Sequence, residues 1–299
     1  MTRQEYLSEL KYELRTLPVE EQEEALEYYR CYFDDAEDDT KVIEEFGSPR
    51  ELAESIMGKF ASLPQVNKPS ENSSSDGSFG NFSPSEVRSL DISVGVAEVV
   101  IAGEGDRFCV EYRNLEPGDI KCSLSPFGTF CVENKRRLPD ISRIFQKEKE
   151  KVNHARILIK IPSECRVDLL RLHVGAGSLV TKNVTITSSR SYMDVGAGNL
   201  EADQVLGGCA ELHVGMGHLS YRGSVSGKIK AECGLGQIEM FLKGKESDYS
   251  MEAKVGLGSV SFNGQKKDGF GNLEASEIKA NHFAVQCGLG EVKIKMSEN

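Results

Sequence analysis

Four residues of types that commonly bind metal ions recur at nearly equal spacing along the chain. His173, Asp194, His213 and Glu232 lie 21, 19 and 19 residues apart, and Lys254 continues the series. Imidazole nitrogens and carboxylate oxygens are ligands for zinc and related ions. Metal ligands must converge on one point, however, whereas one residue per repeat forms a row along stacked strands. The series therefore predicts alternating charge and hydrogen bonding between neighbouring strands, with metal binding as the less favoured alternative.

These residues belong to a glycine repeat. Six segments have the form apolar-Gly-apolar-Gly, and their first glycines are 21, 19, 19, 22 and 32 residues apart. A Gly-x-Gly turn can cradle a phosphate, but the third glycine of the dinucleotide-binding pattern is missing from every copy. A motif in every repeat predicts architecture, through either a bend that needs positive φ or close approach between coils. The six copies begin at Val174, Val195, Val214, Cys233, Val255 and Cys287.

The cysteines and the remaining polar residues show no catalytic pattern. Cys233 and Cys287 replace valine in the repeat, which predicts small buried hydrophobic side chains. Cys122 and Cys131 could face each other across a predicted hairpin and form a redox switch, the less favoured alternative. The sequence has no Gly-x-Ser-x-Gly elbow, His-Glu-x-x-His helix or Cys-x-x-Cys pair. We therefore predict that the protein is not an enzyme, and we assign no catalytic, cofactor-binding or metal-binding residue and no cofactor.

Apolar residues alternate on both sides of each Gly-x-Gly turn. In the first copy Leu172 and Val174 precede the turn and Leu179 follows it, and the other copies keep apolar residues at these places. The alternation predicts two short strands per repeat, and a period near 20 residues is typical of stacked β-coils. Residues 86–299 are therefore predicted to form a β-solenoid or β-roll.

Less regular segments precede the repeats. Leu90–Val96 predicts a degenerate first strand pair, and Phe108–Arg113 and Ala155–Ile161 predict single strands. Lys121–Glu133 predicts a hairpin. The loop Lys135–Lys151 carries seven basic and three acidic residues and is predicted to be a solvated excursion rather than a nucleic-acid site.

One further glycine segment lies between the last two copies. Asp268–Leu273 resembles a seventh turn, but Lys266 and Asp268 occupy positions that should face inward. Both a coil and a protruding loop therefore remain open for Gly269–Gly271.

The first sixty residues have the periodicity of a helical bundle. A capping box of Thr2 and Glu5 opens a helix that runs to about Thr16. A second helix is expected over about Val19–Ala36. Its buried side should carry Ala25, Leu26, Tyr29 and Phe33.

Two further helices complete the predicted bundle. A short helix over Lys41–Phe46 should end at Gly47, a residue suited to a left-handed C-cap. Ser48 and Glu51 form a second capping box, with Pro49 at the first helical position.

Charge and composition separate this bundle from the rest of the chain. The 299 residues carry a net charge of −11, and residues 1–60, with 17 acidic and 7 basic side chains, account for −10. Residues 61–85 are rich in Ser, Asn, Pro and Gly, which predicts a flexible linker. The sequence thus predicts α and β structure in two separate domains, residues 1–60 and 86–299.

Composition also excludes several classes of protein. The acidic balance disfavours a strongly basic nucleic-acid binder, and no apolar run reaches the roughly 18 residues of a membrane helix. The N-terminus lacks the apolar region of a secretory signal. Eight cysteines in such a chain predict free thiols in a reducing compartment, and hence a cytoplasmic location.

The N-terminal segments carry a family resemblance. Leu14-Arg15-Thr16-Leu17-Pro18, the Glu-rich second helix and Phe46-Gly47-Ser48-Pro49-Arg50-Glu51-Leu52-Ala53 resemble the HAAS family of α-helical signalling domains. The resemblance implies bacterial signalling and a functional link to PadR-like transcription regulators. Transmembrane helices often follow the domain in that family, whereas here a β-domain follows.

The β-domain resembles a second bacterial family. The Val-Gly-x-Gly-x-Leu copies and the preceding strand Ile157–Pro162 resemble the "putative adhesin" β-solenoid domain of unknown function. The resemblance covers about residues 89–296, and the adhesin label implies surface display.

Together these features predict a non-catalytic bacterial interaction or regulatory protein. The helical domain would dock a protein partner, such as a PadR-like regulator, and the solenoid would supply a rigid surface or self-associate through its open strand edges. A surface adhesin or carbohydrate binder is the alternative, and a β-helix carbohydrate-active enzyme is a weaker one. Direct nucleic-acid binding and a membrane span are not expected.

Overall fold

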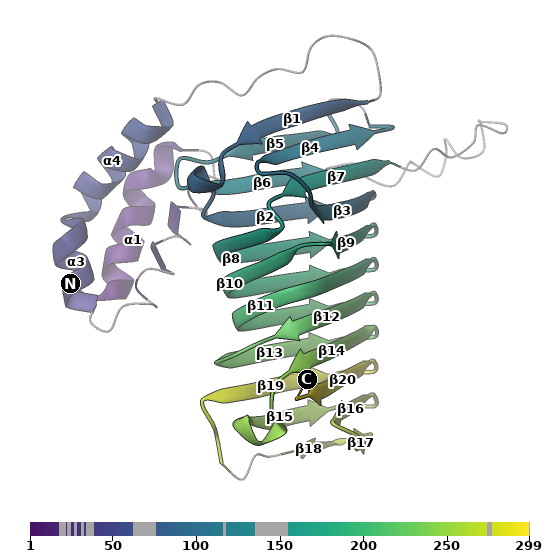
Figure 1. The fold of residues 1–299 in the computed structure, drawn as a ribbon. Coiled ribbons are helices and arrows are strands. Elements are labelled where there is room, and N and C mark those ends of the chain that lie inside the picture. The colour runs from purple at the N-terminus through teal and green to yellow at the C-terminus, as the bar shows by residue number, and fades with distance from the viewer. Residues whose placement is uncertain are drawn as a thin grey trace, which may run out of the picture. The chain divides into compact units, whose positions relative to one another are not determined.

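The computed structural model describes residues 1–17, 22, 25–26, 29–30, 33, 39–61, 76–115, 118–134, 155–273 and 277–298. Two compact units divide the chain, Met1–Val66 and Asn67–Asn299. The first unit is helical and the second is built almost entirely of β-strands (Figure 1). We call them the helical domain and the β-domain.

The helical domain contains α1 (Arg3–Glu13), a 3-10 turn (Leu14–Thr16), α3 (Asp39–Phe46) and α4 (Pro49–Ala61). Both predicted capping boxes are present, at the start of α1 and at the start of α4. Gly47 ends α3 with φ of +73°, as expected of a left-handed C-cap. Much of the predicted second helix lies outside the described residues. Its four predicted core residues are helical and buried.

The predicted linker, residues 61–85, reaches too far along the chain. Gly77–Phe82 forms strand β1, and Pro84–Glu86 forms a 3-10 turn. The Phe79 ring stacks on Tyr112 with centroids 5.2 Å apart, and Phe82 packs edge-on against Phe130 at 5.7 Å. Burial of these two aromatic rings offsets the ordering entropy of the surrounding Ser, Asn and Gly residues. Residues 62–75 of the linker lie outside the described residues.

The predicted strands of the β-domain are present. The degenerate pair is β2 and β3, the strand at Phe108–Arg113 is β4, the hairpin is β5 and β6, and the strand at Ala155–Ile161 is β7. The bounds are β2 (Ser89–Val94), β3 (Glu98–Gly103), β4 (Phe108–Arg113), β5 (Ile120–Leu124), β6 (Thr129–Asn134), β7 (Arg156–Ile161), β8 (Glu164–Val174), β9 (Ser178–Lys182), β10 (Thr185–Val195), β11 (Asn199–Val214), β12 (His218–Ser224), β13 (Lys228–Cys233), β14 (Gln237–Lys243), β15 (Tyr249–Val255), β16 (Ser259–Phe262), β17 (Gln265–Asp268), β18 (Gly271–Leu273), β19 (Asn281–Cys287) and β20 (Glu291–Ser297).

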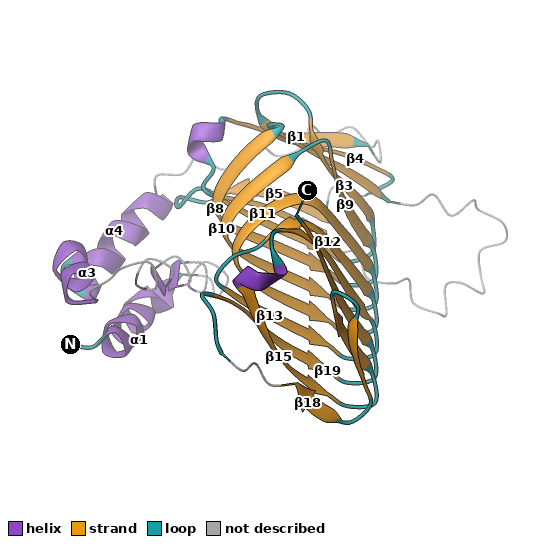
Figure 2. Ribbon diagram, turned by 60° about the horizontal axis from the view of Figure 1, so that its bottom comes forward, coloured by secondary structure: helices purple, strands orange, loops and turns teal. Residues whose placement is uncertain are grey.

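Each Gly-x-Gly turn joins two strands that pair in parallel with the strands of neighbouring turns. We call the two strands around one turn a layer. The register is strict: Leu172, Met193 and Leu212 lie opposite one another on β8, β10 and β11. Figure 2 shows the strands stacked one above another along the β-domain. Inward residues of the layers form one continuous buried core. The two strands per repeat that the sequence predicts are therefore stacked as long parallel ladders, in a sheet that does not close on itself.

The order of the layers differs from the order of the chain at both ends of the stack. The layer of β19 and β20, from the C-terminus, lies between that of β13 and β14 and that of β15 and β16. Figure 1 shows these yellow strands between green ones. Likewise, β2 and β3 lie between the pair β6 and β7 and the pair β8 and β9. At the C-terminal end the chain skips one layer position and later returns to fill it with β19 and β20. At the other end the chain forms β2 and β3 first, then the outer pair β6 and β7, and then β8 and β9 on the opposite side of β2 and β3.

Antiparallel strands cover both ends of the parallel stack. At one end β4 pairs with β7, β5 with β6, and β1 with β4. At the other end β17 pairs with β16 and β18 with β15. The open parallel edges that we expected for self-association are therefore occupied by the chain itself.

The glycine segment left open between coil and loop is part of the second end cap. Gly269 and Gly271 join β17 to β18 with φ of +70° and +153°. The turn resembles the repeat in sequence, but its strands run antiparallel to their neighbours. Lys266 and Asp268 are thus accommodated on an edge strand rather than in the core.

Close approach between layers explains the repeated glycines. A Cβ added at Gly198 would lie 2.3 Å from the carbonyl oxygen of Gly177, and one at Gly217 would lie 2.2 Å from that of Gly198. No motif glycine among the described residues has a positive φ. Of the two explanations that the sequence left open, backbone contact between stacked turns is the one that the structure shows.

Candidate functional site

The outward side of α1 is one candidate surface. Glu9, Tyr12 and Glu13 share a helix face because residues three and four apart are neighbours. Tyr12 is 61% exposed, and the Arg15 guanidinium lies 4.0 Å from its ring centroid. Aromatic residues and arginine are enriched in protein-binding surfaces, so the exposed Tyr12 ring with Arg15 beside it makes this face a candidate.

Hydrogen bonds within the two capping boxes fix the first turns of α1, which carries this surface, and of α4. The Thr2 N–H donates to Glu5 Oε2 at 2.8 Å, and the Glu5 N–H donates to Thr2 Oγ1 at 3.3 Å. The same exchange joins Ser48 and Glu51 at 3.1 and 3.3 Å. Backbone hydrogen bonds from Thr2 and Ser48 lower the pKa of Glu5 and Glu51 respectively.

An aromatic cluster forms the core of the helical domain. Tyr6 meets Phe33 edge-on at 5.7 Å, and Phe46 meets both Phe33 and Tyr29 at 6.3 and 5.0 Å. The Tyr6 hydroxyl donates to the Gly47 carbonyl at 3.1 Å, which ties α1 to the end of α3. Burial raises the pKa of Tyr6 to about 12.

The row of histidines and acids in the β-domain is present, with one change. His173 Nδ1 lies 2.6 Å from Asp194 Oδ2, and His213 forms a hydrogen bond with Glu232. Lys230 also contacts Glu232 at 2.7 Å, and its hydrogen bond is the main cause of the lowered pKa of Glu232. Lys254 is not the next member of the row, because the inserted strand β19 lies between β13 and β15.

Members of the row contact their neighbours along the stack and do not converge on one point as the ligands of a metal ion would. Among the described residues, no group of three or more His, Cys, Asp or Glu side chains is placed to hold a metal ion. Of the five row positions, His173 with Asp194 and His213 with Glu232 thus form interstrand contacts of the kind that their spacing predicts.

The cysteines also follow the prediction for buried thiols, but the suggested redox pair does not form. Cys233 and Cys287 are buried on neighbouring layers. In the hairpin, Cys122 lies opposite Val132 and Cys131 lies opposite Ser123. Successive residues of a strand point to opposite faces, so this register turns the two thiols away from each other.

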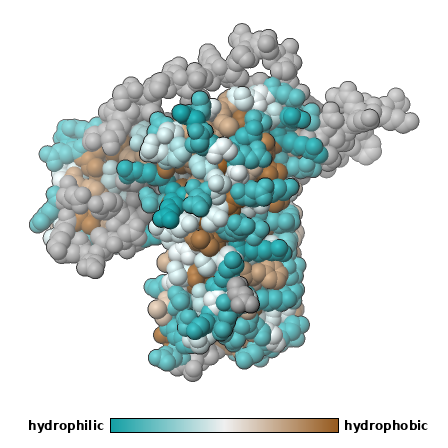
Figure 3. Space-filling view, viewed as in Figure 1, coloured by the Kyte–Doolittle hydropathy of each residue, from teal (hydrophilic) through white to brown (hydrophobic). Residues whose placement is uncertain are grey.

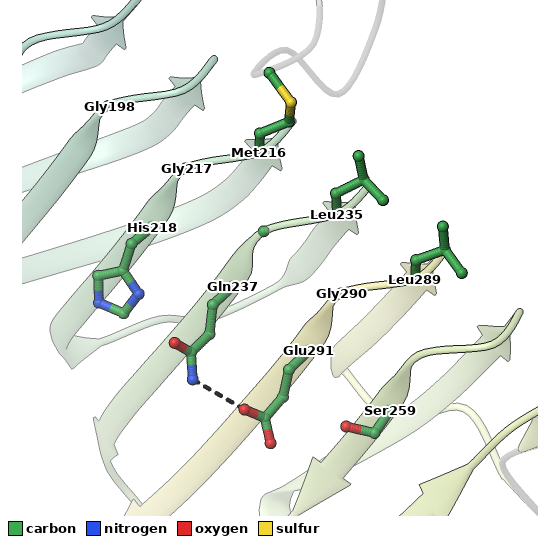
Figure 4. A pocket seen from close by; sticks show the side chains of 11 residues that line it. Gly198, Met216, Gly217, His218, Leu235, Gln237, Ser259, Leu289, Gly290 and Glu291 are labelled. Carbon is green, nitrogen blue, oxygen red and sulfur yellow. Dashed lines mark hydrogen bonds between the residues drawn. The ribbon is translucent and has the colours of Figure 1, made fainter.

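The second candidate surface, which the sequence did not reveal, is the outer edge of the turns. Residues between the two glycines of a turn point outward (Figure 4). Met216, Leu235, Leu257 and Leu289 are each more than half exposed. Met216, Leu235 and Leu289 border a shallow depression of about 690 Å³. Polar residues of the next strands also line it, among them His218, Gln237 and Glu291.

These side chains are exceptions on a largely polar surface. In the view of Figure 3, hydrophilic side chains cover most of the visible face of the β-domain, with scattered hydrophobic patches. Their signal in the sequence is an apolar residue inside each glycine pair. Strict alternation would have turned that residue inward, whereas the bend of the backbone turns it outward.

The geometry thus defines a two-part chain, an acidic helical domain and a layered β-domain with an apolar edge. Residues 5–55 match the HAAS family. The helical domain is therefore a HAAS domain, a type of domain that interacts with partner proteins. None of the described helices is both long and apolar enough to cross a membrane.

Three solved structures are similar to most of the chain at low identity. A "putative cell adhesion protein" from Clostridium sporogenes ATCC 15579 has 16% identity and a TM-score of 0.40, with 77% of this chain and 100% of that chain covered. A "putative lipid binding protein" from Parabacteroides distasonis ATCC 8503 has 11% identity and a TM-score of 0.33, with 77% and 98% covered. A "putative adhesin" from the same organism has 8% identity and a TM-score of 0.21, with 74% and 98% covered. No curated protein matches the sequence.

Proposed function

We propose that this chain is a non-catalytic, cytoplasmic interaction protein of a bacterial regulatory system. The HAAS domain docks a transcription regulator of the PadR-like class, and the β-domain, a β-solenoid, supplies a rigid surface. The observation that carries the proposal is the HAAS match over residues 5–55. Its helix α1 presents a strip in which Glu9 and Tyr12 are exposed and Glu13 is half-buried.

Electrostatics supports this docking mode. Residues 1–60 carry −10 of the net charge, whereas the remaining 239 residues carry only −1. A surface with one sign of charge steers a partner of the opposite sign toward it, and this attraction weakens as salt is added. Regulators that bind DNA carry basic surfaces, so the acidic domain suits such a partner.

A pull-down with the full chain tests the proposal. The tagged chain is used as bait in lysate of the organism that encodes it, beside the charge-reversed variant Glu9→Lys/Glu13→Lys. The control variant is Glu104→Lys/Asp106→Lys, which changes the net charge equally at exposed positions of the β-domain. We expect a helix-turn-helix regulator to be captured by the wild type and the control, and lost with the variant or at high salt.

Other outcomes would favour the alternatives named from the sequence. Capture of glycans or envelope proteins by all three baits, together with a surface-exposed pool in fractionated cells, would replace the regulatory function with that of an adhesin. Turnover of a polysaccharide by the purified chain would replace it with that of an enzyme.

A further inference from the structure

Five exposed apolar side chains lie on neighbouring turns at one edge of the β-domain. Met216, Leu235, Leu289 and Leu257 occupy four adjacent layers, in that order along the stack. Phe270 extends the row in the end cap, where the Gly269 N–H donates to the Gly258 carbonyl at 3.1 Å. The five side chains are between 57% and 78% exposed. We call this row the turn ridge.

The stacking of the turns fixes the spacing of the ridge. The Leu235 N–H donates to the Gly215 carbonyl and the Leu289 N–H donates to the Gly234 carbonyl, each at 2.8 Å. Side chains on successive layers are therefore one strand spacing apart, about 4.8 Å. Figure 4 shows Met216, Leu235 and Leu289 pointing to the same side.

The architecture of the turn does not require large apolar side chains at these positions. Two earlier turns of the same stack carry alanine there, at Ala176 and Ala197, between glycines with the same close contacts. Large apolar residues at successive solvent-exposed positions are the feature that marks an interaction site in a soluble domain.

We propose that the turn ridge is a self-association surface that packs against the ridge of a second copy of this chain. The ridge of a second copy has the same spacing between its side chains. Each side chain of one ridge can therefore fit between two side chains of the other along the whole row. A two-fold axis generates such a self-complementary contact from one surface.

The charges beside the ridge favour a second copy over a charged partner or an anionic lipid surface. On one flank Glu232 is paired with Lys230 at 2.7 Å. On the other flank Lys293 contacts Glu239 at 3.0 Å and Glu291 at 3.6 Å. The first flank pairs one base with one acid, and the second carries a single excess negative charge. Two copies therefore approach with little like-charge repulsion, and the flanks offer little net charge to attract a charged partner.

The area of the ridge fits a contact of moderate strength. Burial of five such side chains removes roughly 100 Å² each from water, or about 500 Å² per copy. A standard interface buries about 800 Å² per partner, and the polar residues beside the ridge, such as His218 and Gln237, supply the remainder. We therefore expect a dimer with a dissociation constant in the micromolar range.

This proposal deepens the proposed function, because it names the partner of the rigid surface, but its test is independent of the regulator. Sedimentation velocity of the full chain is measured from about 1 to 200 μM, the range that brackets micromolar affinity. The ridge variant is Leu235→Ala/Leu289→Ala, which reproduces the protein's own Gly-Ala-Gly turns and so preserves the fold. The control is Ile278→Ala, an aliphatic residue in the loop before β19, off the ridge, that is 71% exposed against 57% for the two leucines.

We expect the wild type and the control to dimerise, and the ridge variant to bind at least tenfold more weakly with an unchanged far-ultraviolet circular dichroism spectrum. A wild type that stays monomeric at 200 μM would overturn the proposal, as would a ridge variant that dimerises as tightly as the wild type. Ridge-dependent co-sedimentation of a monomeric chain with neutral phosphatidylcholine vesicles would overturn it in favour of a lipid surface.

Discussion

Replacement of Gly217 by alanine should destabilise the β-domain much more than the same replacement at Gly215, two residues earlier in the same turn. A Cβ at position 217 would lie 2.2 Å from the Gly198 carbonyl oxygen and 2.6 Å from Val195 Cγ1. A Cβ at position 215 would lie 3.0 Å from the Gly196 carbonyl oxygen. Neither glycine has a positive φ, so the difference reports the spacing between layers and not backbone strain.

The expected magnitude follows from these contacts. To accept a methyl group at position 217, the two turns must separate locally by about 1 Å, since a normal carbon–oxygen contact lies above 3 Å. This separation stretches the hydrogen bonds from Met216 N to Gly196 O and from His218 N to Gly198 O, now 2.7 and 3.0 Å. Each contributes about 1 kcal/mol, and overpacking adds about 1–3 kcal/mol. We expect a loss of about 3–5 kcal/mol for Gly217→Ala and about 1 kcal/mol for Gly215→Ala.

Urea unfolding of the full chain, followed by far-ultraviolet circular dichroism, measures the loss. The control is Gly118→Ala, where a Cβ meets no atom within 4 Å and φ is not positive. That variant should equal the wild type or exceed it by up to about 1 kcal/mol, because alanine restricts the unfolded chain. Equal losses at positions 215 and 217 would refute the conclusion that contact between stacked turns selects glycine.

Three further predictions concern the helical domain, the thiols and the inserted layer. The capping carboxylates Glu5 and Glu51 have lowered pKa values, so their contribution to stability is complete above the ordinary value of 4.5 and is lost as pH falls through the lowered values. Thermal unfolding of the helical domain is measured as a function of pH. In the double variant with glutamine at both positions, the unfolding temperature should therefore fall less than in the wild type as the pH is lowered. Cys209 is exposed, whereas burial raises the pKa of Cys122 to about 12 and that of Cys165 to about 11, so an aromatic disulfide reagent should label Cys209 far faster in the native chain. A chain that ends before β19 leaves β13 and β15 without the strand that pairs with both, and we expect it to aggregate on gel filtration; a folded, soluble truncated chain would contradict the insertion.

Local patterns explain how much of the fold could be predicted. The capping boxes at Thr2 and Ser48 and the C-cap at Gly47 depend on residues within one turn of helix, so the sequence alone places them correctly. The strands around each Gly-x-Gly turn likewise follow from alternation over a few residues. The end of the linker was missed because Phe79 and Phe82 gain their stability from Tyr112 and Phe130, which are distant in sequence.

The order of the layers could not be predicted, for a physical reason. The inward residues of β19, such as Val285 and Cys287, have the same size and polarity as those of the other layers. Apolar alternation therefore does not distinguish one position in the stack from another. The position of β19 depends on contacts between layers, such as Val285 between Ala231 and Ala253, that no local pattern encodes. The turn ridge could not be predicted for a related reason. Alternation of apolar residues along a strand does not show where the backbone bends, and the bend turns the ridge residues outward.

The central claim is that the acidic helical domain binds a regulator, and calorimetric titration tests it most directly. The purified full chain is titrated into the PadR-like regulator of the same organism at low and high salt, beside the variants Glu9→Lys/Glu13→Lys and Glu104→Lys/Asp106→Lys. We expect saturable binding by the wild type and by the β-domain control, and weaker binding by both at high salt. The helical-domain variant should bind at least tenfold more weakly than the wild type. The absence of binding, or equal binding by the helical-domain variant, would contradict it.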